Sequence, residues 1–219
     1  MLTNQFWDPI QLSLIVATIA VLIVTVSGTS TAWFMANRHF TGKTTLETLL
    51  LLPIVLPPTV IGFLLVIIFG RNGPVGQLID SLFNQSVLFT IWAAIIAAVV
   101  VSFPLMYQSA KTGFQSIDKG IEDAARVDGA NEREIFRYIS IPLCFKPIIA
   151  GITLSFARAL GEFGATIMFA GNIPGKTQTI PTAIYVAFES NQTTLAWAWV
   201  ISIIIISYLM LFVLKKSDR

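Results

Sequence analysis

The stretch DKGIEDAARVDGANEREIFRYISIP, residues 118–142, holds 10 of the chain's 26 charged residues and lies between two long apolar segments. Charged side chains at this density need water or another protein around them. If the flanking segments lie in a membrane, this charged segment must therefore lie on one side of it. An ordinary solvated loop that contains a helix is the alternative interpretation of the charge alone.

The first half of the charged segment predicts a short helix. Asp118 is a suitable N-cap for a helix over about Lys119 to Asp128. Within that helix, Ala124 and Ala125 offer a small surface for close packing. Gly129 can then adopt the left-handed conformation that commonly ends a helix.

The second half of the charged segment predicts another helix. Asn131, followed three residues later by Glu134, fits a capping box. Three side chains then fall on one face at helical spacing, namely Ile135, Tyr138 and Ile139. We expect Pro142 to end this helix. The charged segment is thus a predicted helix-turn-helix.

The composition is that of a membrane protein. The 219 residues are 55% hydrophobic and 12% charged, with a mean hydropathy of +0.76, whereas soluble domains carry about 25% charge. A net charge of +2 gives no reason to expect a nucleic-acid partner. One cysteine, Cys144, excludes an internal disulfide, and with His39 as the single histidine it argues against a metal site.

The apolar segments predict an all-α integral membrane protein, with one transmembrane domain over residues 1–219. Each is close to the ~20 residues that cross the hydrocarbon core. The expected spans are residues 10–34, 46–69, 87–109, 147–170 and 195–214. Residues 71–86 are predicted to be a polar loop. Residues 180–188 are apolar but too short to span, so we expect a surface or partly inserted helix there.

The basic residues predict the orientation. Five spans put the two ends on opposite sides of the membrane, and the loops on the side of the charged segment hold 11 Lys and Arg, against two on the other side. The positive-inside rule therefore places the charged segment and the C-terminus in the cytoplasm, and the N-terminus outside. The 11 are Arg38, Lys43, Lys111, Lys119, Arg126, Arg133, Arg137, Lys146, Lys215, Lys216 and Arg219, and the two are Arg71 and Lys176.

Arg158 and Glu162 are charges deep inside a predicted span. Each costs about 2.5–3.5 kcal/mol at the centre of the hydrocarbon core, so both should face a neighbouring helix or a wet cavity. They are four residues apart and can pair on one helix face. Beside them, Ala157, Gly161 and Ala165 permit close helix approach. The pair is either a structural lock between helices or a border of the translocation pathway that attracts or gates an anion.

Prolines mark the second predicted span. Pro53, Pro57 and Pro58 each remove a backbone donor, so they must disturb that helix. Pro57-Pro58-Thr59 can expose carbonyl groups at a kink in the pathway, or can be kinked packing without a pathway role. Ser102, a hydroxyl inside the third span, is a further pathway candidate.

The chain carries no convincing nucleotide site. Residues 171–177, GNIPGKT, approach a phosphate-binding loop, but Ala170 stands where that pattern requires glycine. Residues 42–44, GKT, fail in the same way because Asn37 occupies the glycine position. We therefore expect no bound cofactor, no metal and no catalytic residue, and energy from a separate ATPase.

The charged segment resembles the EAA loop of ATP-binding-cassette importer permeases, which reads E-A-A-x3-G-x9-I-x-L-P. Asp123 stands where the family has Glu, with Glu122 adjacent, and Ile141 stands where it has Leu. In that family the loop forms a coupling helix pair that docks in a groove of a cytoplasmic ATPase. The resemblance implies coupling roles for Glu122, Asp123, Ala124, Ala125, Gly129, Ile139 and Pro142.

Three further segments resemble the molybdate permease branch of these importers. They are LLPIVLPPTVIG at 51–62, FARALGEFGAT at 156–166 and GNIPGKTQTIP at 171–181. The resemblance implies a type I importer permease fold in the lipid bilayer of a bacterial cytoplasmic membrane. It also implies a homodimer, two ATPase subunits that bind ATP and Mg, and an extracytoplasmic oxyanion-binding protein.

On this resemblance, the expected function is ATP-driven import of molybdate by alternating access. Tungstate and sulfate or thiosulfate permeases share parts of these motifs and remain alternatives. An ATP-independent channel or carrier would not need the coupling motif. An intramembrane enzyme would need a nucleophile and a base, and the spans offer no Ser–His pair.

Overall fold

The computed structural model describes residues 2–38 and 40–217, and these residues form helices and no strand. The side chains described are those of residues 6–38 and 40–212. The helices are α1 Leu2–Asn37, α2 Lys43–Val55, α3 Pro58–Phe69, α4 Pro74–Phe83, α5 Ile91–Gln115, α6 Lys119–Val127, α7 Glu132–Ile135, the π-helical turn η1 Phe136–Ser140, α8 Ile141–Leu143, α9 Phe145–Leu160, α10 Gly164–Phe169, α11 Ile180–Glu189 and α12 Thr193–Ser217.

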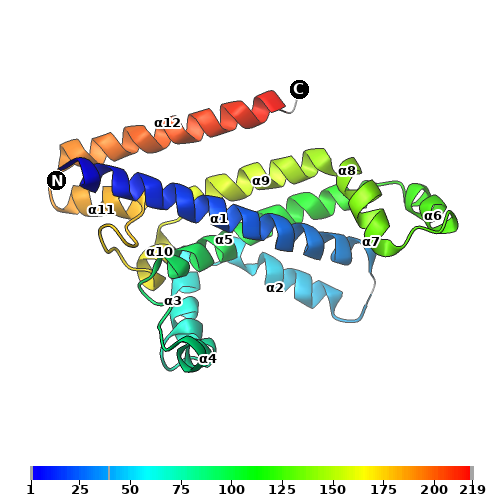
Figure 1. The fold of residues 1–219 in the computed structure, drawn as a ribbon, viewed down its shortest axis with the longest axis horizontal. Coiled ribbons are helices and arrows are strands. Elements are labelled where there is room, and N and C mark those ends of the chain that lie inside the picture. Colours follow the sequence, from blue (N-terminus) through cyan, green and yellow to red (C-terminus); the bar gives the residue numbers. More distant parts are fainter. Residues whose placement is uncertain (1, 39, 218–219) are drawn as a thin grey trace.

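Helices α1, α5 and α9 pack lengthwise and form the centre of the bundle (Figure 1). Glycines let these helices come close together. A Cβ added at Gly28 or Gly151 would come within about 3 Å of Met106 on α5. In a bilayer, such close backbone approach gains dispersion energy between helices. Alanines of α1 and α5 fill the buried centre, including Ala17, Ala20, Ala93, Ala97 and Ala98.

The first, third and fifth predicted spans each correspond to one long helix. Helices α1, α5 and α12 are long and apolar enough to cross a membrane. Helix α1 begins earlier and ends later than residues 10–34, and α5 runs on past residue 109 to Gln115. Helix α12 runs from the end of the bundle near the N-terminus toward the end that carries α6 to α8 (Figure 1).

The second predicted span is not one helix. The chain breaks between α2 and α3, and the two helices are bent by 117°. Leu56 and Pro57 are extended, with ψ of 138° each, because a residue that precedes proline avoids the helical region and consecutive prolines lack the donors that would continue the ladder. Pro53 lies inside α2 without breaking it. The prediction of a proline disturbance is confirmed, and the span predicted over 46–69 corresponds to a bent helix pair.

The fourth predicted span is also interrupted. Helix α9 ends at Leu160, and α10 begins at Gly164 after a three-residue break. At its other end, α9 is bent by 76° from the helical stretch Glu132–Leu143, with the break at Cys144. Pro142 does not end that stretch, because it lies in the first turn of α8, where a missing N–H is tolerated.

Two connections hold short helices. The predicted polar loop at residues 71–86 contains α4, which starts with Pro74 and ends at Asn84 in the left-handed conformation, φ 51°. The apolar residues 180–188 lie in α11, which packs against α12 and α1. Its Ile180 N–H donates to the Ser13 hydroxyl at 2.8 Å, deep in the protein. Insertion of α11 into the membrane stays a prediction.

Candidate functional site

Helix α6 has the ends that the sequence predicts. The Asp118 carboxylate accepts a hydrogen bond from Gly120 N–H at 2.9 Å, which caps the start. At the other end, Gly129 has φ 93° and no atom within 4 Å of where a Cβ would stand. The turn closes with the Ala130 N–H donating to the Ala125 carbonyl at 3.0 Å. The backbone therefore reverses at a position that glycine alone adopts without strain.

Helix α7 starts with the predicted capping box. The Asn131 side chain accepts from the N–H groups of Arg133 and Glu134, both at 3.0 Å. In return, the Glu134 carboxylate accepts from the Asn131 N–H at 2.8 Å. Two orphan donors of the first turn are thereby satisfied. The capping box thus starts a helix in the middle of a solvated segment.

Arg126 joins the two helices of the charged segment. Its guanidinium donates to Asp123 at 2.6 Å and to Glu132 of α7 at 2.8 Å, and it lies 3.8 Å from Glu122. The hydrogen bond from Arg126 is the main cause that lowers the pKa of Glu132 below its ordinary value. The sequence carries a signal for this pairing, because acidic residues stand three and four positions before Arg126.

The adjacent acidic residues of the EAA-like motif face opposite ways. Glu122 is buried, and its carboxylate accepts from the Ser140 hydroxyl at 2.8 Å. The Asp123 side chain is exposed beside Arg126. Glu122 therefore fastens α6 to the π-helical turn, whereas Asp123 lies on the outer surface. Ser140 carries no sequence signal for this role, because the π-helical turn that points it inward is not visible in the residue spacing.

The π-helical turn also corrects the predicted apolar face. Ile135 is fully buried, but Tyr138 is 69% exposed and Ile139 is half-buried. One extra residue in the turn η1 rotates the following side chains away from the α-helical register. Phe136 takes the inward position instead, with its ring centroid 5.0 Å from Trp33 and 6.2 Å from Phe114.

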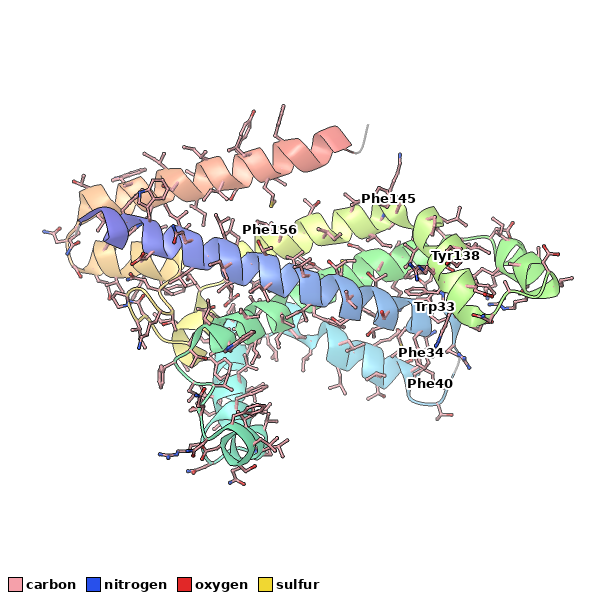
Figure 2. The ribbon with its side chains drawn as sticks, in the orientation of Figure 1. Trp33, Phe34, Phe40, Tyr138, Phe145 and Phe156 are labelled. Atoms are coloured by element: carbon pink, nitrogen blue, oxygen red, sulfur yellow. The ribbon has the colours of Figure 1, made fainter. Side chains whose placement is uncertain are left out.

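The charged segment presents apolar side chains outward. Val127 is 88% exposed at the end of α6, and Ala124 on the same helix is also exposed. Tyr138 lies at the same end of the bundle as Trp33, Phe34 and Phe40 (Figure 2). Val127 and Tyr138 thus leave apolar surface exposed at this end of the protein.

The two helix breaks come together. A Cβ added at Gly164, the first residue of α10, would lie 2.8 Å from the Pro58 Cβ of α3. One turn further, a Cβ at Gly62 would lie 3.0 Å from the Ala165 Cα. Glycines thus allow α3 and α10 to pack backbone to backbone, and exposed Pro57 and Thr59 adjoin this contact.

Arg158 and Glu162 form an ion pair at the second break. The Arg158 guanidinium donates to one Glu162 carboxylate oxygen at 2.5 Å. The other oxygen accepts from the Ala165 N–H at 2.7 Å, so Glu162 also caps α10. Glu162 lies beyond the end of α9 and is 3% exposed, whereas the Arg158 side chain is 31% exposed.

The remaining pathway candidate lies elsewhere. Ser102 is fully buried between α5 and α9, where its hydroxyl donates to the Ala98 carbonyl at 2.6 Å. Its own carbonyl accepts from the Ser155 hydroxyl at 3.2 Å. The structure therefore brings Arg158, Glu162, Pro57, Pro58 and Thr59 to the two breaks and leaves Ser102 in the helix packing. Among the residues described, no group of three or more His, Cys, Asp or Glu side chains could hold a metal ion.

Residues 28–219 match the family described as "Binding-protein-dependent transport system inner membrane component". The chain belongs to this family. It is therefore an integral inner-membrane permease component.

Curated relatives cover almost the whole chain. The "Putative molybdenum transport system permease protein YvgM" of Bacillus subtilis is 56% identical over 98% of this chain and 94% of that protein. The "Molybdenum transport system permease protein ModB" of Escherichia coli K12 is 42% identical over 86% of this chain and 82% of that protein. The "Sulfate transport system permease protein CysW" of Synechococcus elongatus is 34% identical over 87% of this chain and 66% of that protein.

Solved structures show the same fold at low sequence identity. A bacterial ABC transporter involved in the import of the acidic polysaccharide alginate matches with a TM-score of 0.75 at 16% identity, over 99% of this chain and 79% of that chain. An inward-facing MetNI methionine ABC transporter matches with a TM-score of 0.67 at 13% identity, over 99% of this chain and 94% of that chain. The chain thus has the fold of ABC importer permeases.

Proposed function

We propose that this chain is the membrane subunit of an ATP-driven molybdate importer. Two copies form the pathway, two cytoplasmic ATPase subunits bind ATP and Mg, and an extracytoplasmic binding protein delivers the oxyanion. The charged segment then lies in the cytoplasm with the C-terminus, and the N-terminus lies outside, as the distribution of basic residues predicts. On this proposal the chain itself binds no cofactor.

The observation that carries this proposal is the charged segment. Its two helices are capped, joined by Arg126 and fixed by the buried contact between Glu122 and Ser140. Such a unit can move as one body and so transmit a displacement of a bound ATPase to α5 and α9, which it connects. Exposed Val127 at its tip gives the ATPase an apolar contact. A passive channel has no use for this arrangement.

Molybdate is the best-supported substrate because the molybdenum permease relatives are more similar to this chain than the sulfate permease is, at 56% and 42% against 34% identity. Sulfate is the second candidate on the strength of that last relative. Molybdate, tungstate and sulfate are all tetrahedral dianions, so the helix breaks need only accept that shape and charge. Selectivity among them then resides mainly in the binding protein.

The proposal is tested by reconstituting the chain with its ATPase and binding protein in lipid vesicles. We expect uptake of molybdate that needs ATP and the binding protein and exceeds uptake of sulfate. Vesicles with ADP are the control for passive leak. Equal uptake with ADP contradicts the ATP-driven mechanism. Faster uptake of sulfate than of molybdate would make sulfate the substrate and leave the mechanism unchanged.

A further inference from the structure

The Arg158–Glu162 pair is asymmetric. The Glu162 carboxylate is fixed on both oxygens, by the Arg158 guanidinium at 2.5 Å and by the Ala165 N–H at 2.7 Å. It is also almost completely buried. Arg158 has one contact to Glu162 through Nη1, and its side chain is 31% exposed. The carboxylate is therefore the fixed member of the pair, and the guanidinium is the member with donors to spare.

Arg158 lies in the last turn of α9, at the end of that helix far from the charged segment. It is 13 residues after Phe145, about 20 Å along the helix axis at the α-helical rise. The exposed residues near it are Ala150, Leu154 and Ala157 on α9, and Gly161 just beyond the end of that helix. An arginine that faced lipid at this depth would be costly, so this face must meet a second copy or a wet path.

We propose that Glu162 is a built-in competitor of the transported anion for Arg158. In the empty pathway Glu162 holds the guanidinium, and a passing tetrahedral oxyanion takes over its free donors. This inference rests on the proposed function and adds a role for one pair of residues. The guanidinium fork suits an oxyanion because it can present two parallel N–H donors.

The competition has a physical purpose. A guanidinium without a partner in a site of low dielectric constant would bind a dianion tightly, and conduction requires that binding be weak enough for release. Glu162 lowers the affinity by the free energy needed to give up the ion pair. Because Glu162 also caps α10, whose first residue touches Pro58, the exchange of partners occurs where the two helix breaks meet.

The test measures equilibrium binding of radiolabelled molybdate to the permease–ATPase complex in nanodiscs, without binding protein. We expect Glu162→Gln to bind molybdate about tenfold more tightly than wild type, because the variant gives up no ion pair when the anion binds. We also expect it to transport molybdate more slowly. Glu162→Gln keeps an oxygen acceptor for the Ala165 N–H. We expect Arg158→Gln to lose binding at least tenfold, and Arg158→Lys to retain part of it.

Matched controls carry the same charge changes away from the breaks. Lys146→Gln removes a cation at the other end of α9, and Glu189→Gln removes a carboxylate from α11; both should bind as wild type does. A purely structural ion pair predicts that Glu162→Gln and Arg158→Gln change binding in the same direction or not at all, and either result overturns the inference. Uptake by the wild-type complex in vesicles tests the proposed function separately, so the two can fail independently.

Discussion

At the scale of single residues, Arg126 is the centre of the charged segment. Its guanidinium bridges carboxylates of both helices, Asp123 on α6 and Glu132 on α7. Both carboxylates and the arginine are more than a third exposed, so each pair contributes less than about 1 kcal/mol. The importance of Arg126 therefore lies in fixing the angle between the helices more than in the stability of the fold.

We expect Arg126→Gln to weaken association with the ATPase severalfold while the amount of folded permease in the membrane stays unchanged. The neutral side chain loses both ion pairs, so α6 and α7 can move independently. Co-purification of the ATPase, quantified against the permease, is the measurement. Arg133→Gln is the matched control, because Arg133 is an exposed arginine that makes no ion pair among the described side chains. Equal loss with both variants would assign the effect to charge alone.

Glu132 gives the charged segment a defined pH dependence. Its pKa is lowered in the folded state, chiefly by the hydrogen bond from Arg126. A lowered folded-state pKa means that the stabilisation is present above the unfolded value, about 4.3, and is lost as the pH falls through the folded value. We expect the amides of α6 and α7 to be better protected from exchange in the wild type than in Glu132→Gln at neutral pH. This difference should vanish below the folded-state pKa of Glu132. A difference that persists there contradicts the role of the ion pair.

At the scale of elements, the turn between α6 and α7 depends on Gly129. Its φ of 93° is unfavourable for any residue with a Cβ, although the space around it is open. We expect Gly129→Ala to cost about 1–2 kcal/mol of local backbone strain and no steric clash. Hydrogen exchange over residues 119–135 should increase and the ATPase should be retained less well. Gly42→Ala places the same strain before α2, where φ is 89° and the space is also open, and should leave ATPase retention unchanged.

The sequence predicted the elements whose causes are local. Asp118, Gly129 and the Asn131–Glu134 capping box act within a few residues, and the structure confirms all of them. The break at Leu56–Pro57 was visible as prolines, but its bend of 117° depends on how α3 packs on α10. The π-helical turn and the inward position of Ser140 have no local signal, because the partner of Ser140, Glu122, lies 18 residues away in the sequence.

The candidate site at the helix breaks was predictable in part. Arg158 and Glu162 stood out as charges in an apolar segment, and they do pair. The interruption of α9 at Leu160 was not predicted, because no proline stands between Pro147 and Pro174 to mark it. Gly161 was predicted to lie on one helix ridge with Ala157 and Ala165, but it follows the last residue of α9, and Ala165 lies on α10.

At the scale of the whole molecule, the exposed apolar helices must be covered by lipid or by a second copy. Helix α2 has no buried residue, and only 11% of the most apolar stretch of α12 is buried. Lipid can cover both, since most of their exposed side chains are apolar. It cannot cover the face of α9 at the same low cost, because Arg158 lies beside Ala157 on that helix.

We therefore expect the α9 faces of two copies to lie opposite each other across the pathway. In a Cys144→Ala background, Ala157→Cys should cross-link between copies with a reagent that spans about 10 Å, and the yield should change when ATP is added. Leu209→Cys on α12 is the control, because it is exposed to lipid on this interpretation and should not cross-link. Cross-linking at Leu209 with none at Ala157 would place the dimer interface on α12. In that arrangement Arg158 would lie outside the pathway, and the competition with Glu162 would have no anion to act on.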